Sequence, residues 1–112
     1  MNNFVSTIPS EAIKDFCQHW KISALAVFGS ALREDFNSQS DLDILVTFTP
    51  SAEWGLLDHV QMQLELENLF HRHVDLISKR ALEQSPNWIR REEILSTAQI
   101  LFSESEATHA PR

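Results

Sequence analysis

The spacing of apolar positions changes from segment to segment along this chain, and the changes predict alternating helices and strands. Apolar residues recur every three or four positions, as in amphipathic helices, in residues 10–20, 54–70 and 87–98. Short continuous or alternating apolar runs predict strands in residues 22–28, 41–48 and 73–78. Shorter helices are expected at 30–36 and 79–84, and residues 99–102 fit either a helix end or an edge strand. This order predicts a small α/β (α+β) domain with a sheet of few strands.

The length and composition indicate one folded domain. A chain of 112 residues with 43% hydrophobic and 22% charged residues is ordinary for a single soluble domain. We expect this domain to span residues 1–102 and the polar residues 103–112 to form a disordered tail. The first ten residues lack the features of a signal peptide, and no run approaches the ~18 apolar residues of a membrane span. A cytoplasmic protein without membrane contact is therefore expected.

Charge and rare residue types exclude several kinds of partner and site. The formal net charge of -7 disfavours direct binding to nucleic acid. Cys17 is the only cysteine, so the chain can form neither an intrachain disulfide nor a thiolate metal cluster. The chain has no tyrosine, so any phenolic acceptor must belong to another molecule.

The strongest chemical signal is a glycine and a serine followed, after ten intervening residues, by paired aspartates. Gly29 ends a buried strand where the chain must turn and a ligand can approach the backbone, and Ser30 offers a hydroxyl and a backbone N–H to phosphate oxygens. Asp41 and Asp43 lie two apart on a strand, so their carboxylates share one face and suit Mg²⁺. Asp75, on a later strand, could supply a third carboxylate. An Asp-x-Asp pair alone often only terminates a strand, but the full combination at this spacing favours a two-metal site for phosphoryl transfer.

These residues resemble the signature of the DNA polymerase β-type nucleotidyltransferases. The resemblance lies in Phe-Gly-Ser-Ala-Leu-Arg at 28–33, Asp35, Ser-Asp-Leu-Asp-Ile-Leu-Val at 40–46 and Val-Asp-Leu-Ile at 74–77. It spans roughly residues 10–102 and implies the core fold of that superfamily, a small mixed sheet with flanking helices. Within the superfamily, the short chain is most similar to the minimal nucleotidyltransferases, the antitoxins encoded beside HEPN-domain toxins.

The resemblance also implies a role for each matching residue. Gly29 and Ser30 would hold the nucleotide triphosphate, and Arg33 could meet phosphate. Asp41, Asp43 and Asp75 would be the metal ligands and catalytic carboxylates, and Asp75 would also draw the proton from the acceptor hydroxyl. Ala31 and Glu34 depart from the family pattern, in which many relatives have a basic residue and a glycine.

The function implied by the resemblance is transfer of AMP from ATP, with two Mg²⁺ ions, to a tyrosine of a HEPN ribonuclease toxin, which is thereby neutralised. Larger relatives carry a further domain that positions the acceptor, and residues after Phe102 are too few to build one. Two alternatives remain open at this point. The chain could be a non-catalytic antitoxin that occludes its partner, or an enzyme that modifies a small molecule.

Several other residues invite a functional interpretation but have a simpler one. Alternation places His73 on the face of Asp75, where it could touch nucleotide or partner, yet a partly exposed histidine at a strand start is the simpler expectation. His19 and His59 lack a metal-ligand partner at helical spacing. The three tryptophans are expected to fill the core or an interface.

Overall fold

The computed structural model describes residues 10–29 and 41–104. Each helix and strand that the apolar pattern predicts within these residues is present, and Gln99–Ser103 forms a strand rather than a helix end. The predicted helix at 30–36 and the last eight residues of the tail lie outside the described residues. The elements in chain order are α1 (Ser10–His19), β1 (Ile22–Phe28), β2 (Leu42–Phe48), α2 (Leu56–Phe70), β3 (Val74–Ser78), α3 (Lys79–Glu83), α4 (Trp88–Thr97) and β4 (Gln99–Ser103).

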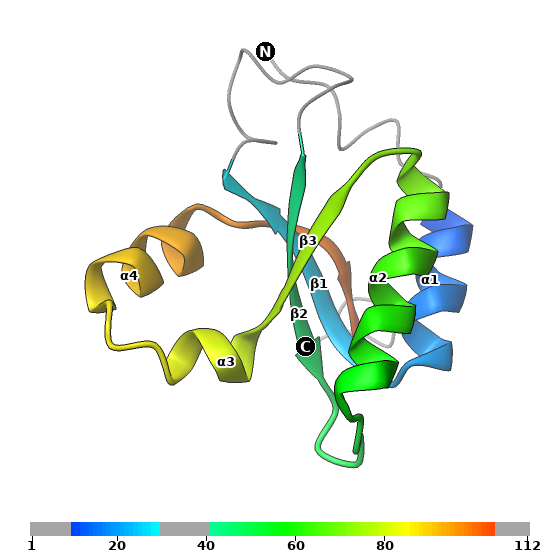
Figure 1. Ribbon diagram of the computed structural model, residues 1–112, viewed down its shortest axis with the longest axis horizontal. Helices are drawn as coiled ribbons and strands as arrows, with labels where there is room; N and C mark the ends of the chain where they lie inside the picture. Colours follow the sequence, from blue (N-terminus) through cyan, green and yellow to red (C-terminus); the bar gives the residue numbers. More distant parts are fainter. Residues whose placement is uncertain (1–9, 30–40, 105–112) are drawn as a thin grey trace, which may run out of the picture.

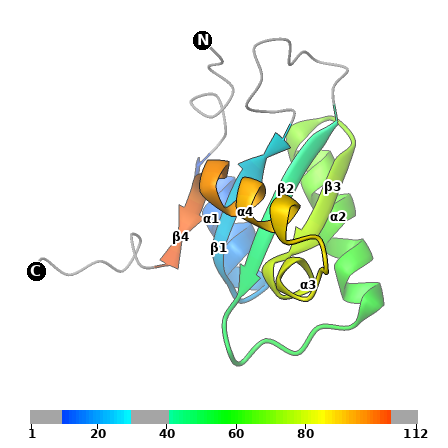
Figure 2. The same ribbon diagram turned by 90° about the vertical axis from the view of Figure 1, so that its left-hand side faces the viewer.

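The strands form one mixed sheet (Figure 1) in the order β3-β2-β1-β4, which can be followed in Figure 2. β1 pairs antiparallel with both β2 and β4, whereas β2 and β3 run parallel. Parallel neighbours need a long crossover connection, and α2 supplies it. The expectation of a small mixed sheet with flanking helices is confirmed.

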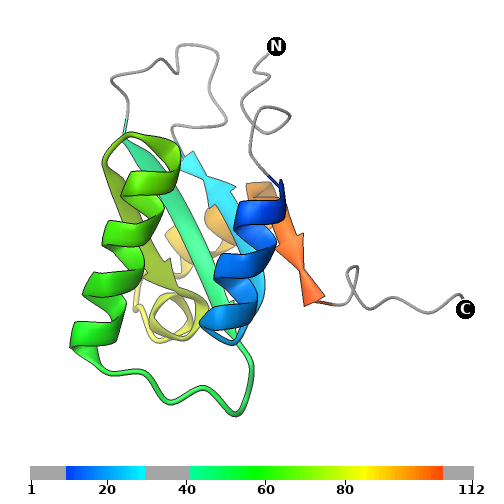
Figure 3. The ribbon, with the colours of Figure 1, turned by 90° about the vertical axis from the view of Figure 1, so that its right-hand side faces the viewer.

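The helices divide between the two faces of the sheet. α1 and α2 cover one face (Figure 3), where the main core contains Ile13, Leu25, Ile44 and Leu66. α3 and α4 lie over the other face (Figure 2), where a smaller core joins Phe28, Leu45, Leu82 and Ile94. Within residues 10–29 and 41–104, no helix combines the length and apolar character that crossing a membrane requires.

α2 has apolar residues on two sides, and only one of them faces the sheet. The stripe most visible in the sequence is exposed, with Leu57 84%, Val60 45% and Leu64 50% accessible. Met62 and Leu66, which are 1% and 0% accessible, face the sheet instead. Because positions four apart share a helix face, the buried stripe continues to the partly buried Phe70.

We predict that Leu66→Ala lowers the free energy of unfolding by about 2–5 kcal/mol, because it removes a fully buried side chain and leaves a cavity. The matched change Leu64→Ala, on the exposed stripe of the same helix, should cost less than about 1 kcal/mol. Urea unfolding followed by circular dichroism compares the two. Equal losses would show that α2 is rotated relative to this description.

Burial in the main core raises the pKa of the Cys17 thiol from 9.0 to about 12. In the native state the thiol therefore stays protonated at pH values where the unfolded thiol ionises, and the stabilisation present below pH 9 is lost as the pH rises toward 12. We predict that iodoacetamide labels Cys17 far more slowly in the native protein than in urea at pH 9, as measured by mass spectrometry. Similar labelling rates in the two states would contradict the burial of Cys17.

Candidate functional site

Two of the predicted aspartates lie on neighbouring strands at one end of the sheet. β1 ends and β2 and β3 begin at this end, and the parallel pairing places Asp43 opposite Asp75. On the other side of β2, Asp43 is opposite Phe28. Phe28 belongs to the smaller core, so Asp43 and Asp75 share the sheet face on which α3 and α4 lie (Figure 2). Adjacent strands are about 5 Å apart, which brings two like charges close together.

Gly29 fits the space beside the carboxylate of Asp43. Its φ of +66° is in the left-handed region that side chains rarely adopt. A Cβ atom added at Gly29 would lie only 2.5 Å from Asp43 Oδ2. The end of β1 therefore approaches Asp43 closely because residue 29 has no side chain.

Asp41 lies just before β2 and close to the start of β3. The backbone N–H of Leu42 donates to the carbonyl of His73 at 2.9 Å. The ring of His73 lies between two carboxylates, with Nδ1 3.6 Å from Asp41 Oδ1 and Nε2 3.7 Å from Glu67 Oε2. Glu67, in α2, also accepts the backbone N–H of Val74 at 3.0 Å. No pattern in the sequence points to Glu67, and for His73 the sequence predicts only a partly exposed residue.

The described residues present part of the predicted constellation. The predicted nucleotide-binding residues Ser30 and Arg33 lie outside the described residues. No three His, Cys, Asp or Glu side chains within 10–29 and 41–104 are grouped so as to hold a metal ion together. Mg²⁺ in nucleotide sites is commonly bound by one or two carboxylates together with phosphate oxygens. The neighbouring carboxylates of Asp43 and Asp75 fit an ion of that kind.

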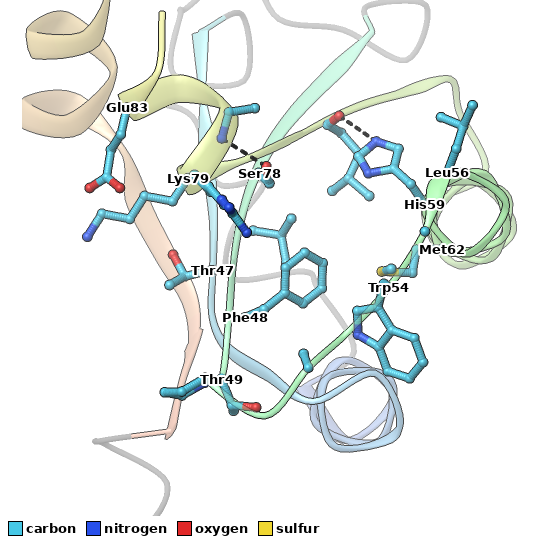
Figure 4. A pocket seen from close by; sticks show the side chains of 17 residues that line it. Thr47, Phe48, Thr49, Trp54, Leu56, His59, Met62, Ser78, Lys79 and Glu83 are labelled. Atoms are coloured by element: carbon cyan, nitrogen blue, oxygen red, sulfur yellow. Dashed lines mark hydrogen bonds between the residues drawn. The ribbon is translucent and has the colours of Figure 1, made fainter.

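A cavity of about 930 Å³ lies at the opposite end of the sheet (Figure 4). Its lining includes Phe48, Trp54, His59 and Lys79. His59 Nε2 lies 3.0 Å from the carbonyl of Leu76 on the edge strand β3. The volume suits a small molecule, but β2 lines it at residues 46–48, three or more positions from Asp43. The lining residue next to Asp75 is Leu76, which faces the other side of the sheet. At about 3.3 Å per residue, this cavity is separate from the aspartates.

A comparison with protein families identifies the class of this chain. Residues 9–101 match the model of the nucleotidyltransferase domain. The chain therefore belongs to the nucleotidyltransferase domain family, and it is a nucleotidyltransferase.

Two relatives are similar to this chain in sequence. A provisionally named protein adenylyltransferase of Methanocaldococcus jannaschii is 32% identical over 69 residues, which are 62% of this chain and 78% of the relative. The protein adenylyltransferase MntA of Thermococcus cleftensis is 33% identical over 70 residues, 62% of this chain and 69% of the relative. The chain is thus similar to proteins named for adenylyl transfer to protein.

Solved structures share the fold. A structure provisionally described as a minimal nucleotidyltransferase has a TM-score of 0.66 at 33% identity, covering 88% of this chain and 95% of that one. A toxin–antitoxin crystal structure with AMP-PNP has a TM-score of 0.66 at 17% identity, over 89% of this chain and 77% of that one. A tri-AMPylated Shewanella oneidensis HEPN toxin in complex with MNT antitoxin has a TM-score of 0.58 at 16% identity, over 96% and 76%. For the two structures at 17% and 16% identity, the similarity shows only that the fold is shared.

We predict that Gly29→Ala lowers the free energy of unfolding by about 1–2 kcal/mol, because alanine is strained at this positive φ and its Cβ would displace the Asp43 carboxylate. Gly55→Ala is the matched control, since its Cβ would lie 4.0 Å from the nearest side-chain atom, Asp58 Oδ2. The control should cost less than about 1 kcal/mol. If denaturant unfolding shows no loss for Gly29→Ala, the close approach to Asp43 is wrong.

Proposed function

We propose that this chain is an antitoxin that transfers AMP from ATP to a tyrosine hydroxyl of a partner HEPN-domain ribonuclease toxin and so neutralises it. The observation that carries the proposal is the register of β2 and β3, which pairs Asp43 with Asp75 beside the side-chain-free Gly29. The similarity to named protein adenylyltransferases supports the transferred group. The fold shared with HEPN–MNT complexes supports the class of partner.

We assign the metal-binding role to Asp41, Asp43 and Asp75 together with phosphate oxygens of the nucleotide, because the three carboxylates are not grouped closely enough to hold an ion by themselves. Two neighbouring carboxylates repel one another unless a cation lies between them, and their oxygen atoms suit Mg²⁺. When bound, Mg²⁺ would polarise the phosphoryl group and offset the charge that develops on it. The open approach to the backbone at Gly29, followed by Ser30 and Arg33, would hold the triphosphate.

The proposed reaction is an in-line displacement at the α-phosphorus of ATP. The acceptor oxygen forms a bond to this phosphorus, the bond to the bridging oxygen breaks, and pyrophosphate leaves with the electron pair. The proton of the acceptor hydroxyl passes to the carboxylate of Asp75. A phenol with an ordinary pKa of about 10 needs such a base at neutral pH.

The exposure of the two central aspartates supports this division of roles. Asp75 is exposed on the edge strand β3, where an acceptor from another molecule can reach it. Asp43 is half-buried on the inner strand β2, closer to the end of β1 and Gly29. The chain contains no tyrosine, so a modified tyrosine would always belong to the partner.

We predict that Asp43→Asn slows AMP transfer about a hundredfold to a thousandfold, the equivalent of several kcal/mol of transition-state stabilisation. The change keeps the shape of the side chain and removes its charge. The measurement is intact-protein mass spectrometry of the toxin after incubation with ATP and Mg²⁺, in which each transfer adds the mass of one AMP group. Asp15→Asn, on an exposed position of α1, is the matched control and should transfer at the wild-type rate.

The same variant separates catalysis from simple occlusion. If Asp43→Asn binds the toxin, leaves it unmodified and still abolishes its ribonuclease activity, neutralisation needs only binding. If the wild-type protein adds no AMP to the toxin, the transfer reaction itself is refuted.

A further inference from the structure

A histidine between two carboxylates links α2 to the end of the sheet that carries the aspartates. Glu67 lies in the last turns of α2, His73 immediately precedes β3, and Asp41 immediately precedes β2. The two ring nitrogens of His73 point to different partners, Nδ1 toward Asp41 at 3.6 Å and Nε2 toward Glu67 at 3.7 Å. These three side chains come from three separate segments of the chain.

The position of Glu67 is well defined. Its Oε2 atom accepts the backbone N–H of Val74 at 3.0 Å and is the same atom that faces His73. Glu67 is only 24% exposed, in contrast to 59% for His73 and 66% for Asp41. Glu67 is therefore the most buried of the three side chains, and Asp41 the most exposed.

The backbone of His73 is fixed by a separate contact. Its carbonyl accepts the N–H of Leu42 at 2.9 Å, which joins the starts of β2 and β3. With its backbone placed in this way, the imidazole ring lies beside Asp41, and Glu67 lies on its other side, 3.7 Å from Nε2. The Asp41 carboxylate, which is 66% exposed with His73 in place, therefore has this ring as one neighbour that limits its orientations.

We propose that His73, held by Glu67, is a positioning residue that orients the carboxylate of Asp41 for binding the magnesium–nucleotide complex. The inference rests on the proposed function, because it assumes that Asp41 is a metal ligand. His73 itself does not touch the metal or the nucleotide in this proposal. Groups that orient a metal ligand commonly change metal affinity about 10–100-fold when removed, and because His73 is 59% exposed we expect a smaller effect, at or below the lower end of that range.

The test measures binding by the isolated protein, without the toxin. Calorimetric titration with Mg²⁺ in the presence of a non-hydrolysable ATP analogue gives the Mg²⁺ concentration at half-saturation. We expect His73→Ala to raise this concentration about threefold to tenfold. His73→Asn should restore most of the affinity, because its amide nitrogen can occupy the place of Nδ1 beside Asp41.

His71→Asn is the matched control. It removes a second exposed imidazole two residues away, at a left-handed position with φ of 57° that asparagine tolerates. We expect wild-type half-saturation for this variant. Amide hydrogen exchange at Leu42 should also be unchanged in His73→Ala, since that hydrogen bond uses the backbone of residue 73.

The outcomes separate the positioning role from its alternatives. Wild-type affinity in His73→Ala, or no recovery in His73→Asn, overturns the positioning role while leaving the proposed function intact. Faster exchange at Leu42 in His73→Ala would show a structural role and also overturn it. If the wild-type protein shows no magnesium-dependent binding of the ATP analogue, the assumed metal site fails, and the positioning role with it.

Discussion

The parallel pairing of β2 with β3 is the constraint on which the candidate site depends. Asp43 and Asp75 are 32 positions apart in the sequence, and only the register of these strands makes them neighbours. A slip of one residue would turn one carboxylate toward the opposite face, into the core that α1 and α2 cover. Leu42, Ile44, Val74 and Leu76 oppose such a slip, because all four are buried on that face. The large core therefore fixes the positions of charged groups on the other side of the sheet.

Much of this arrangement can be predicted from the sequence, because local patterns determine the elements. The apolar runs identify β1, β2 and β3, and the spacing of Gly29, Asp41 and Asp43 marks the end of the sheet at which chemistry is expected. The strand order is a different matter. Strand neighbours are determined by contacts between distant residues, so periodicity alone could not place β2 between β1 and β3 or show that Asp43 faces Asp75.

Local sequence patterns predict neither which face of α2 is buried nor which residues Glu67 contacts. α2 has two apolar stripes, and the sequence does not reveal that Met62 and Leu66 face the sheet while Leu57 and Leu64 face outward. Glu67 resembles any glutamate near a helix end, and its contacts with Val74 and His73 exist only because α2 packs against the edge strand. Tertiary packing decides both cases.

The crossover between the parallel strands explains why α2 reaches the aspartates at all. A helix that connects parallel neighbours must return to the end of the sheet at which both strands begin. The last turns of α2 and the link to β3 consequently arrive beside Asp41, whereas its first turn lies at the other end, beside the separate cavity (Figure 4). The carboxyl end of a helix carries partial negative charge, which adds to that of the aspartates. His71, Arg72 and His73 follow α2 immediately, so the connection that the topology requires also brings three basic side chains to the end of the sheet that carries the aspartates.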